Sequence, residues 1–278
     1  MLNATTSQWV MCRPDYYGIE YIINAWMEGH IGQAHTSTAR HQWQELYQIL
    51  ASRTEVRFIP PVKGVPDLCF TANAGLVMDN IFIPSNFRYP ERQPEEPIYL
   101  SWFRDQGFSI KNIDPGIYFE GEGDALFQPE ESLLWLGYQI RTDIAAQQSL
   151  ETILNVEVIP LRLINPYFYH LDTCFMPLSG GRILYYPSAF DDASLQQIYA
   201  RVPANNRLAV STEDANHFSC NAIVCGDAII CNDASPELRA KLQDWGFEVI
   251  CTPFTEFMLA GGAAKCLVLK LNKRILHA

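Results

Sequence analysis

The pattern of apolar and polar positions divides the chain into five similar segments. In each segment a polar residue runs directly into two short apolar strands that are joined by a turn. The polar residues that open the segments are separated by steps of 51, 48, 49 and 45 residues, and they are Asn73, Asp124, Asp172, Asn221 and Cys266. A fixed period of this length is typical of propellers and other repeat architectures. If the units surround an axis, these five residues converge on one central site, which is a geometry suited to catalysis.

The residues between the hairpins predict a helix and a further strand in each unit. Apolar residues at helical spacing predict a helix over 37–51. Later helices are predicted over 95–106, 142–153, 192–200 and 235–245, and the strands after the five helices over 56–61, 108–113, 156–163, 207–211 and 247–253. We expect the N-terminal strand, 7–14, to pair with the last segment, 263–271, and close a ring. The fold class is therefore α/β, a five-bladed ring, with residues 1–278 forming one domain.

Composition narrows the class of protein further. The chain has 278 residues, of which 48% are apolar, so it can bury a large core. Its net charge of −11 argues against nucleic acid or an anionic membrane as a partner, because both attract clustered Lys and Arg. No run reaches the roughly 18 to 20 apolar residues of a membrane span, and residues 1–15 lack a secretory signal. A small cationic substrate suits this balance of charge.

The eight cysteines and six histidines indicate neither a disulfide framework nor a metal site. No two cysteines form a CxxC pair, and most of them lie in apolar, strand-like runs. Buried, reduced thiols and a cytoplasmic location are the interpretation that fits this pattern. Apart from His170, the histidines show no ligand spacing, so we expect no metal, and no other cofactor is indicated.

Two residues have the chemistry of a nucleophile and its partner base. Cys266 follows Gly261-Gly262-Ala263-Ala264, a run of small residues that permits close approach of the backbone. A cysteine becomes a strong nucleophile when a neighbouring group lowers the pKa of its thiol. His170 lies two residues before Asp172, so the two side chains share one face of a strand and together suit general acid and base catalysis. On local sequence alone, a structural thiol and a core histidine stay open as alternatives.

Three further features add charge or hydrogen-bonding capacity. The run FEGEGD at 119–124 places three carboxylates among glycines, which is costly by mutual repulsion unless a positive group is held there. A solvated acidic turn is the alternative. The amide of Asn73 can both donate and accept hydrogen bonds. Arg92 and Arg141 could each clamp a carboxylate, although ordinary surface arginines fit the local sequence equally well.

Four motifs in this order and spacing resemble those of the guanidino-group modifying enzymes of the pentein fold. The motifs are PDLCFTANAGL, FEGEGDAL, YHLDTCF and GGAAKCLVL. The superfamily includes arginine deiminases, dimethylarginine dimethylaminohydrolases, amidinotransferases and, most similar to this sequence, the cyanobacterial arginine dihydrolase module. The resemblance covers nearly the whole chain. It implies a five-bladed α/β propeller with a pseudo-five-fold repeat, an axial active site, and L-arginine or a methylated arginine as the substrate.

The resemblance also implies roles for nine residues, motif by motif. Cys266 corresponds to the nucleophile, His170 to the general acid and base, and Glu120 to the carboxylate that orients this histidine. The residues that correspond to substrate-binding positions are Asn73 and Asp172 for the guanidinium, Arg92, Arg141 and Asn24 for the α-carboxylate, and Phe70 in the same pocket.

The amide at position 73 bears on the product. Deiminases and dimethylarginine hydrolases carry Asp at the corresponding position, where a carboxylate repels the oxygen of a neutral ureido group. An amide can donate a hydrogen bond to that oxygen and hold the half-processed species. We therefore hypothesise that Asn73 commits the protein to double hydrolysis, as in an arginine dihydrolase. A deiminase or a dimethylarginine dimethylaminohydrolase is the main alternative, and an amidinotransferase or a non-catalytic pentein binding module is a further one.

The sequence departs from the family pattern at two places. INAWM stands near Asn24 where relatives have INPWM, and Glu122 replaces a residue that is usually small. The added carboxylate is expected to alter substrate preference. Relatives are often fused to an ornithine-processing domain, and the sequence leaves open whether this chain is stand-alone or truncated, and whether it forms a homo-oligomer.

Overall fold

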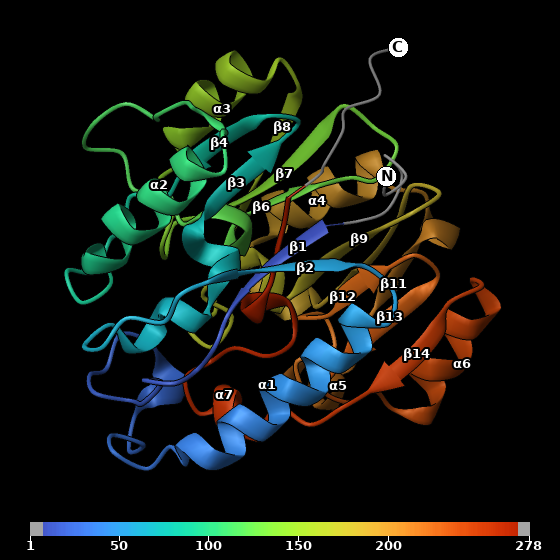
Figure 1. Cartoon of the computed structure of the whole chain (residues 1–278). Helices are drawn as coiled ribbons and strands as arrows, with labels where there is room; N and C mark the ends of the chain where they lie inside the picture. The colour runs from blue at the N-terminus through green and yellow to red at the C-terminus, as the bar shows by residue number, and fades with distance from the viewer. Residues whose placement is uncertain (1–7, 272–278) are drawn as a thin grey trace.

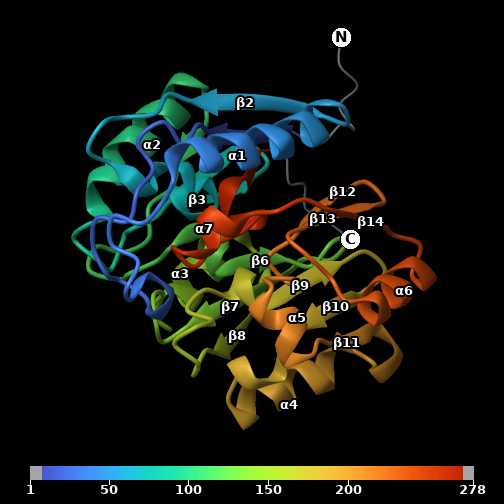
Figure 2. The same cartoon turned by 90° about the horizontal axis from the view of Figure 1, so that it is seen from below.

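The strands of the protein form five small sheets that follow one another around the molecule (Figure 1, Figure 2). A computed structural model describes residues 8–271, so Ser7, the first residue of the predicted N-terminal strand, lies outside it. Each sheet has three strands, in the orders β15-β1-β2, β3-β4-β5, β6-β7-β8, β9-β10-β11 and β12-β13-β14. The predicted α/β ring of five units is confirmed.

The elements of the described residues have the following bounds. The strands are β1 Gln8–Cys12, β2 Glu55–Ile59, β3 Gly75–Met78, β4 Ile81–Pro84, β5 Ser109–Ile110, β6 Ala125–Phe127, β7 Leu133–Tyr138, β8 Glu157–Arg162, β9 Phe175–Leu178, β10 Arg182–Tyr185, β11 Arg207–Ala209, β12 Ile223–Cys225, β13 Ala228–Cys231, β14 Glu248–Cys251 and β15 Leu269–Lys270. The helices are α1 Thr36–Ala51, α2 Glu96–Asp105, α3 Ala146–Leu154, α4 Asp192–Arg201, α5 Thr212–Asn216, α6 Pro236–Asp244 and α7 Thr255–Met258.

Each unit pairs an antiparallel hairpin with a parallel third strand. In the first unit β3 and β4 are antiparallel, whereas β5 returns through helix α2 and runs parallel to β4. A parallel pair needs such a crossover, because a tight turn can only reverse the chain. The helix packs on the sheet that it crosses, and the ring of Phe103 stacks on that of Phe82 with centroids 3.6 Å apart.

The two ends of the described chain close the ring. Strand β1 pairs antiparallel with β15, so that Trp9 lies opposite Lys270. The N–H of Leu271 adds a hydrogen bond of 2.8 Å to the carbonyl of Gln8. Strand β2 completes this sheet in parallel with β1. The predicted pairing of the first and last strands is therefore confirmed.

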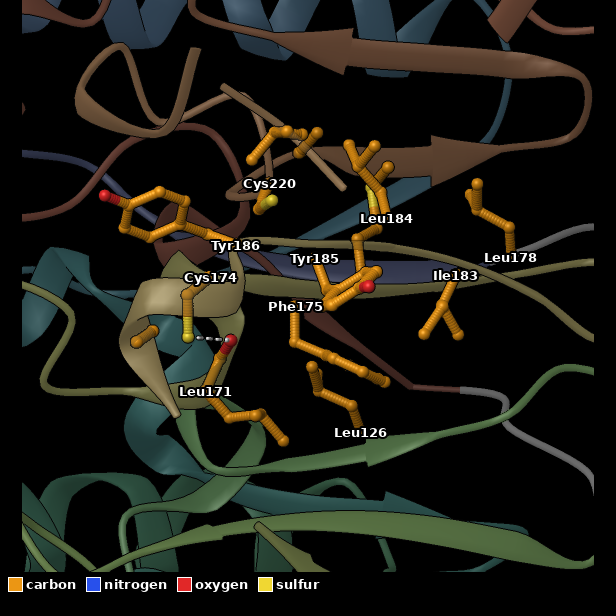
Figure 3. Close-up of a cluster of buried hydrophobic side chains, with 14 of the residues drawn as sticks. Leu126, Leu171, Cys174, Phe175, Leu178, Ile183, Leu184, Tyr185, Tyr186 and Cys220 are labelled. Atoms are coloured by element: carbon orange, nitrogen blue, oxygen red, sulfur yellow. Dashed lines mark hydrogen bonds between the residues drawn. The ribbon is translucent and has the colours of Figure 1, made fainter. Parts of the chain in front are cut away.

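The apolar core runs between neighbouring units. One cluster joins side chains of the second, third and fourth units, among them Leu126 on β6, Phe175 on β9, Leu184 on β10 and Cys220 before β12 (Figure 3). All four are buried. The middle strands β7 and β13 are buried along nearly their whole length, which explains why they read as continuous apolar runs in the sequence.

The structure differs from the sequence-based expectation in two additional helices and in the start of a third. The short helices α5 and α7 were not predicted, and the helix expected from residue 142 begins at Ala146. Helix α3 begins later than expected because residues 142 and 143 instead form hydrogen bonds with residues 118 and 120, in and just before the FEGEGD motif. The hydroxyl of Thr142 accepts from the N–H of Glu120 at 3.1 Å, and the N–H of Asp143 donates to Tyr118 at 2.9 Å. No helix within residues 8–271 is long and apolar enough to cross a membrane.

Short 3-10 turns lead the chain into the inner strands and bring adjacent units into contact. Gly121 lies in one such turn with φ of +61°, and a Cβ there would lie 2.7 Å from the backbone N and O atoms of Gly75. This position therefore requires glycine for two reasons, its left-handed backbone and the lack of room.

We expect Gly121→Ala to lower the free energy of unfolding far more than Gly226→Ala. Gly226 has a similar φ of +66° but no atom within 4 Å of its Cβ position, so alanine there costs about 1 kcal/mol of backbone strain. At Gly121 the overlap with Gly75 adds roughly 1–3 kcal/mol. Urea unfolding followed by circular dichroism measures both, and equal losses would contradict the close approach.

Candidate active site

The five polar residues that open the repeats do not occupy one equivalent position. The carbonyls of Ala74, Asp124 and Cys174 each accept a hydrogen bond from the neighbouring strand, at 3.1, 2.7 and 2.8 Å, so these three residues are equivalent. Asn73 lies one residue before this position and Asp172 lies two before it. The polar residues of the repeats therefore reach the centre from different positions along the chain, because the turns shift the register by one or two residues.

The shift gives Asp124 and Glu122 different surroundings. Asp124 is buried, and its Oδ1 accepts from the N–H of Leu171 at 3.0 Å, which ties the second unit to the third. Glu122 occupies the position equivalent to Asp172, and its Oε2 accepts from Nζ of Lys265 at 2.9 Å. Glu122 is thus held in a buried ion pair beside Cys266, and this pairing explains how the fold accommodates the extra carboxylate.

Cys266 lies in the turn that leads into β15 and is only 3% exposed. Its Sγ is 3.5 Å from Oδ2 of Asp172. A Cβ on Gly262 would lie 3.2 Å from this sulfur and 3.0 Å from the ring of Phe70. The glycine run that precedes the cysteine therefore keeps space open beside the sulfur.

Asn221 holds the sulfur from the other side, a role that the sequence analysis did not assign. Its Nδ2 donates to Sγ of Cys266 at 3.2 Å and to the carbonyl of Asp172 at 3.1 Å. Its Oδ1 accepts from the N–H groups of Ala263 at 3.0 Å and Cys266 at 3.3 Å. The repeat had marked Asn221 as the polar residue of the fourth unit, and that was the only signal in the sequence.

Glu120, Arg141 and His170 form a buried cluster of charged and titratable groups close to Cys266. Glu120 Oε2 lies 2.7 Å from Nε2 of His170 and accepts from Nη1 of Arg141 at 2.9 Å. The three side chains are at most 1% exposed. Although burial favours the neutral acid, Arg141 and His170 hold the pKa of Glu120 well below its usual range. An ionised Glu120 only accepts, so Nε2 carries the proton and Nδ1 of His170 has the free lone pair.

Both the thiol of Cys266 and the imidazole of His170 are neutral at pH 7. Burial lowers the pKa of His170 to about 4 despite the opposing effect of Glu120. Burial and then the carboxylate of Asp172 raise the pKa of the Cys266 thiol. Burial also raises the pKa of Asp172 to about 7, against the attraction of Lys265. A cation placed beside Asp172 would lower the pKa of both groups and so favour the thiolate.

The orientation of the Asn73 amide is fixed by Arg92. Nη1 of Arg92 donates to Oδ1 of Asn73 at 2.9 Å, and since arginine only donates, the amide oxygen must face it. Arg92 is held in turn by a bidentate pair with Glu95, at 2.7 and 2.8 Å. The Nδ2 of Asn73 therefore points the other way, within 3.4 Å of the carbonyl of Glu120. A Cβ on Gly123 would overlap this Nδ2 and lie 3.2 Å from Nδ1 of His170, so the amide donor and the imidazole face each other across a glycine.

The structure brings all nine predicted site residues together. Six of them line one narrow pocket: Asn24, Phe70, Asn73, Arg92, Arg141 and Cys266. The other three contact this group, because Glu120 binds His170 and Arg141 and Asp172 binds Cys266. Arg92 and Arg141, predicted to bind the substrate carboxylate, are also paired with protein carboxylates. Their roles, like those of the other seven residues, stay predictions.

Two buried polar atoms of residues that line this pocket, Nε of Arg141 and Oδ1 of Asp67, have no hydrogen-bond partner within residues 8–271. Oδ1 of Asp172, beside the sulfur of Cys266, is unpaired as well. Buried polar groups are almost always satisfied, so these atoms are available to bind a substrate. One donor and two acceptors suit a molecule that carries both a carboxylate and a cation. Asp67, which the sequence analysis passed over within the PDLCF motif, is part of this set.

A larger cavity of about 280 Å³ is lined by other residues, among them Glu122, Asp172 and Lys265. Asp172 connects this cavity to the narrow pocket, because it also contacts the sulfur of Cys266. In the described part of the chain, no group of three or more His, Cys, Asp and Glu side chains is arranged to hold a metal ion.

Comparisons with known proteins agree with the site's chemistry. A family model described as N,N dimethylarginine dimethylhydrolase, eukaryotic, matches residues 18–273. The bifunctional arginine dihydrolase/ornithine cyclodeaminase ArgZ of Synechocystis sp. is 46% identical over 267 residues, which cover 96% of this chain and 38% of that protein. The N(G),N(G)-dimethylarginine dimethylaminohydrolase of Mycobacterium tuberculosis is 33% identical, over 96% of this chain and 86% of that protein.

The fold is shared as well. A crystal structure of the N-terminal domain of ArgZ, a variant bound to its substrate, superposes with a TM-score of 0.96 at 46% identity and covers 97% of this chain and 100% of that one. The chain thus spans well under half of the length of the bifunctional relative that it matches, and it corresponds to that protein's N-terminal domain.

The contacts of Asn221 predict a specific defect. Asn221→Asp replaces the donor to Sγ of Cys266 by a carboxylate, which should raise the pKa of the thiol by at least one unit and slow its alkylation by iodoacetamide about tenfold or more at pH 8. Asn232→Asp is the matched control, since its side chain binds His217 and Phe254 instead. Peptide mass spectrometry of Cys266 reports the rate, and equal rates in the two variants would show that Asn221 does not tune the sulfur.

Proposed function

The chain belongs to the N,N-dimethylarginine dimethylhydrolase family, and on that premise we propose that it hydrolyses the guanidino group of L-arginine through Cys266. The observation that carries the proposal is the set of unpaired buried atoms beside a cysteine and a histidine. Asp172 and Asp67 offer acceptors, and Arg141 offers a donor. A guanidino amino acid complements this set, because its cation and its carboxylate lie at opposite ends.

Because the thiol of Cys266 and the imidazole of His170 are both neutral, the mechanism we propose is one in which the substrate helps to form the thiolate nucleophile. A guanidinium beside Asp172 supplies the positive charge that the buried thiol lacks. The proton of Cys266 then moves to the lone pair on Nδ1 of His170, and the thiolate attacks the guanidinium carbon. Glu120 stabilises the imidazolium that forms. The imidazolium returns its proton to the departing amine, so ammonia leaves and a thiouronium intermediate remains on the sulfur.

Hydrolysis of the intermediate decides the product. His170 is neutral again and can remove a proton from water, which attacks the thiouronium carbon. If the sulfur then leaves, the product is citrulline. If the ureido group of this product is held and a further C–N bond breaks before release, the overall reaction consumes two waters and gives ornithine, two ammonia and carbon dioxide.

We propose the second outcome, an arginine dihydrolase. The specific support is the orientation of Asn73, whose amide oxygen faces Arg92 and whose Nδ2 donor lies near the carbonyl of Glu120, on the side of Gly123 and His170. A donor at that place can bind the oxygen of a half-processed, neutral ureido group, which an aspartate would repel. The naming of the 46% identical relative as an arginine dihydrolase agrees with this choice. A cytoplasmic location, a single domain over residues 1–278 and a homo-oligomeric state stay predictions.

Incubation with L-arginine tests the proposal directly. We expect two molecules of ammonia for each arginine consumed, with ornithine as the amino-acid product. Cys266→Ser is the control, and it should release no product. One ammonia per citrulline would make the protein a deiminase, and activity on dimethylarginine alone would make it a dimethylaminohydrolase. Dependence on an added amine acceptor would reveal an amidinotransferase.

The Asn73→Asp variant tests the role of the amide. Arg92 can still donate to one carboxylate oxygen, so the side chain should keep its place while losing the Nδ2 donor. We expect citrulline to replace ornithine as the main product. Asn206→Asp, on the loop before β11, serves as a matched control for the same chemical change and should leave the product ratio unchanged. An unchanged yield of ornithine from Asn73→Asp would refute the hypothesis.

A further inference from the structure

We propose that Cys231 and Cys251 form an oxidisable thiol pair, a modification site that hydrogen peroxide or another two-electron oxidant converts into a disulfide. The pair lies in the sheet β12-β13-β14, and neither cysteine is among the groups that contact Cys266. The proposal is independent of the guanidino chemistry.

The sheet register places the two side chains together. Strands β13 and β14 run parallel, and Cys231 lies directly opposite Cys251. Directly paired residues of neighbouring strands project from the same face of a sheet, with the strands about 4.8 Å apart. This spacing falls within the roughly 4.4–6.8 Å between Cα atoms that a disulfide accepts. The two Sγ atoms are already 3.5 Å apart, so a modest rotation of the side chains would bring them to bonding distance.

The two thiols differ in exposure and in pKa, as the attacking and the resolving cysteine of an oxidisable pair should. Cys251 is partly exposed on β14, the edge strand of its sheet, whereas Cys231 is buried. The hydrogen bond between the two sulfurs, in which either can donate, lowers the pKa of the Cys251 thiol to about 7 against the effect of burial, and the charge of Arg239 contributes in the same direction. The same hydrogen bond, together with burial, raises the pKa of Cys231. Cys251 is therefore the thiolate that meets an oxidant in solvent, and Cys231 is the thiol that resolves the product.

Neighbouring cysteines show that this reactivity is specific to the pair. Burial raises the pKa of Cys225, on β12 of the same sheet, and of Cys220 just before that strand. Burial likewise raises the pKa of the proposed nucleophile, Cys266. These thiols are protonated near pH 7, so an oxidant should reach Cys251 before them.

The disulfide forms in two steps. The Cys251 thiolate attacks one oxygen of hydrogen peroxide, forms a sulfenic acid and expels hydroxide, which takes up a proton to give water. The sulfur of Cys231 then attacks the sulfenic sulfur, and a second hydroxide leaves and combines with the proton of the Cys231 thiol. The two thiols lose two electrons in total, and the peroxide is reduced to two waters.

Peptide mapping of the intact, wild-type chain tests the proposal. After a few equivalents of peroxide, remaining thiols are blocked with iodoacetamide under denaturing conditions and the protein is digested with trypsin. Cys231 and Cys251 fall on different peptides, 208–239 and 242–265, and Cys266 falls on a third, 266–270. We expect a cross-linked species of the first two peptides, two hydrogens lighter than their sum. The count of free thiols should fall from eight to six, and dithiothreitol should restore it.

Single variants sharpen the assignment. Cys231→Ser should abolish the cross-link and leave a sulfenic acid on Cys251 that dimedone traps, and Cys251→Ser should abolish both species. Cys225→Ser is the matched control from the same sheet and should form the cross-link as the wild type does. If oxidised wild-type protein shows no link between the two peptides, or a link through Cys220 or Cys225 instead, the proposal is overturned without recourse to the variants.

Discussion

The site depends on one buried carboxylate that serves two cationic or titratable partners. A single oxygen of Glu120 meets both Arg141 and His170, and none of the three groups is open to solvent. Removing Arg141 would leave the charge of Glu120 buried without compensation, which typically costs about 3–5 kcal/mol. The fold must therefore hold residues that are distant in the sequence at hydrogen-bonding distance. Burying these charged groups lowers the stability of the folded state unless the backbone holds them in position to pair.

The backbone does so through the short motif FEGEGD, whose successive residues reach different units of the ring. Glu120 binds His170 of the third unit, while Gly121 packs against Gly75 of the first. Glu122 pairs with Lys265 near the end of the described chain. Gly123 leaves room for Asn73, and Asp124 caps the turn of the third unit through Leu171. Two residues of this motif carry no side chain because other units occupy that space, and the three acids are kept apart by separate partners. Each of the three acidic side chains thus has its own partner, and these contacts offset the repulsion among them.

The sequence predicted those features that repeat and missed those that break the repeat. Apolar runs and their period were enough for the five hairpins, the crossover helices and the closing pair β1 and β15. They could not reveal that the turns place Asn73, Asp124 and Asp172 one or two residues out of register with one another, because 3-10 turns leave no periodic signal. Motif resemblance placed nine residues in one site, yet it gave no hint that Asn221 grips the sulfur or that Glu95 holds Arg92. Such partners are set by tertiary contacts, which a single sequence does not encode locally.

The same contacts explain how closely related chemistry can arise on one scaffold. The Arg92–Glu95 pair fixes which way the side chain at position 73 presents its atoms, whatever that side chain is. With an amide there, the inward atom is a donor, and with a carboxylate it would be an acceptor. The side-chain contacts of the thiol, the imidazole and the Glu120 carboxylate do not involve the amide nitrogen, which donates only to the backbone carbonyl of Glu120 at 3.4 Å. Under the proposed mechanism, the first C–N cleavage uses the thiol, the imidazole and Glu120, whereas retention of the neutral ureido group would depend on one oriented amide. An exchange at position 73 would then change the product while it leaves the ion pair of Glu120 with Arg141 and the contact of Glu120 with His170 in place.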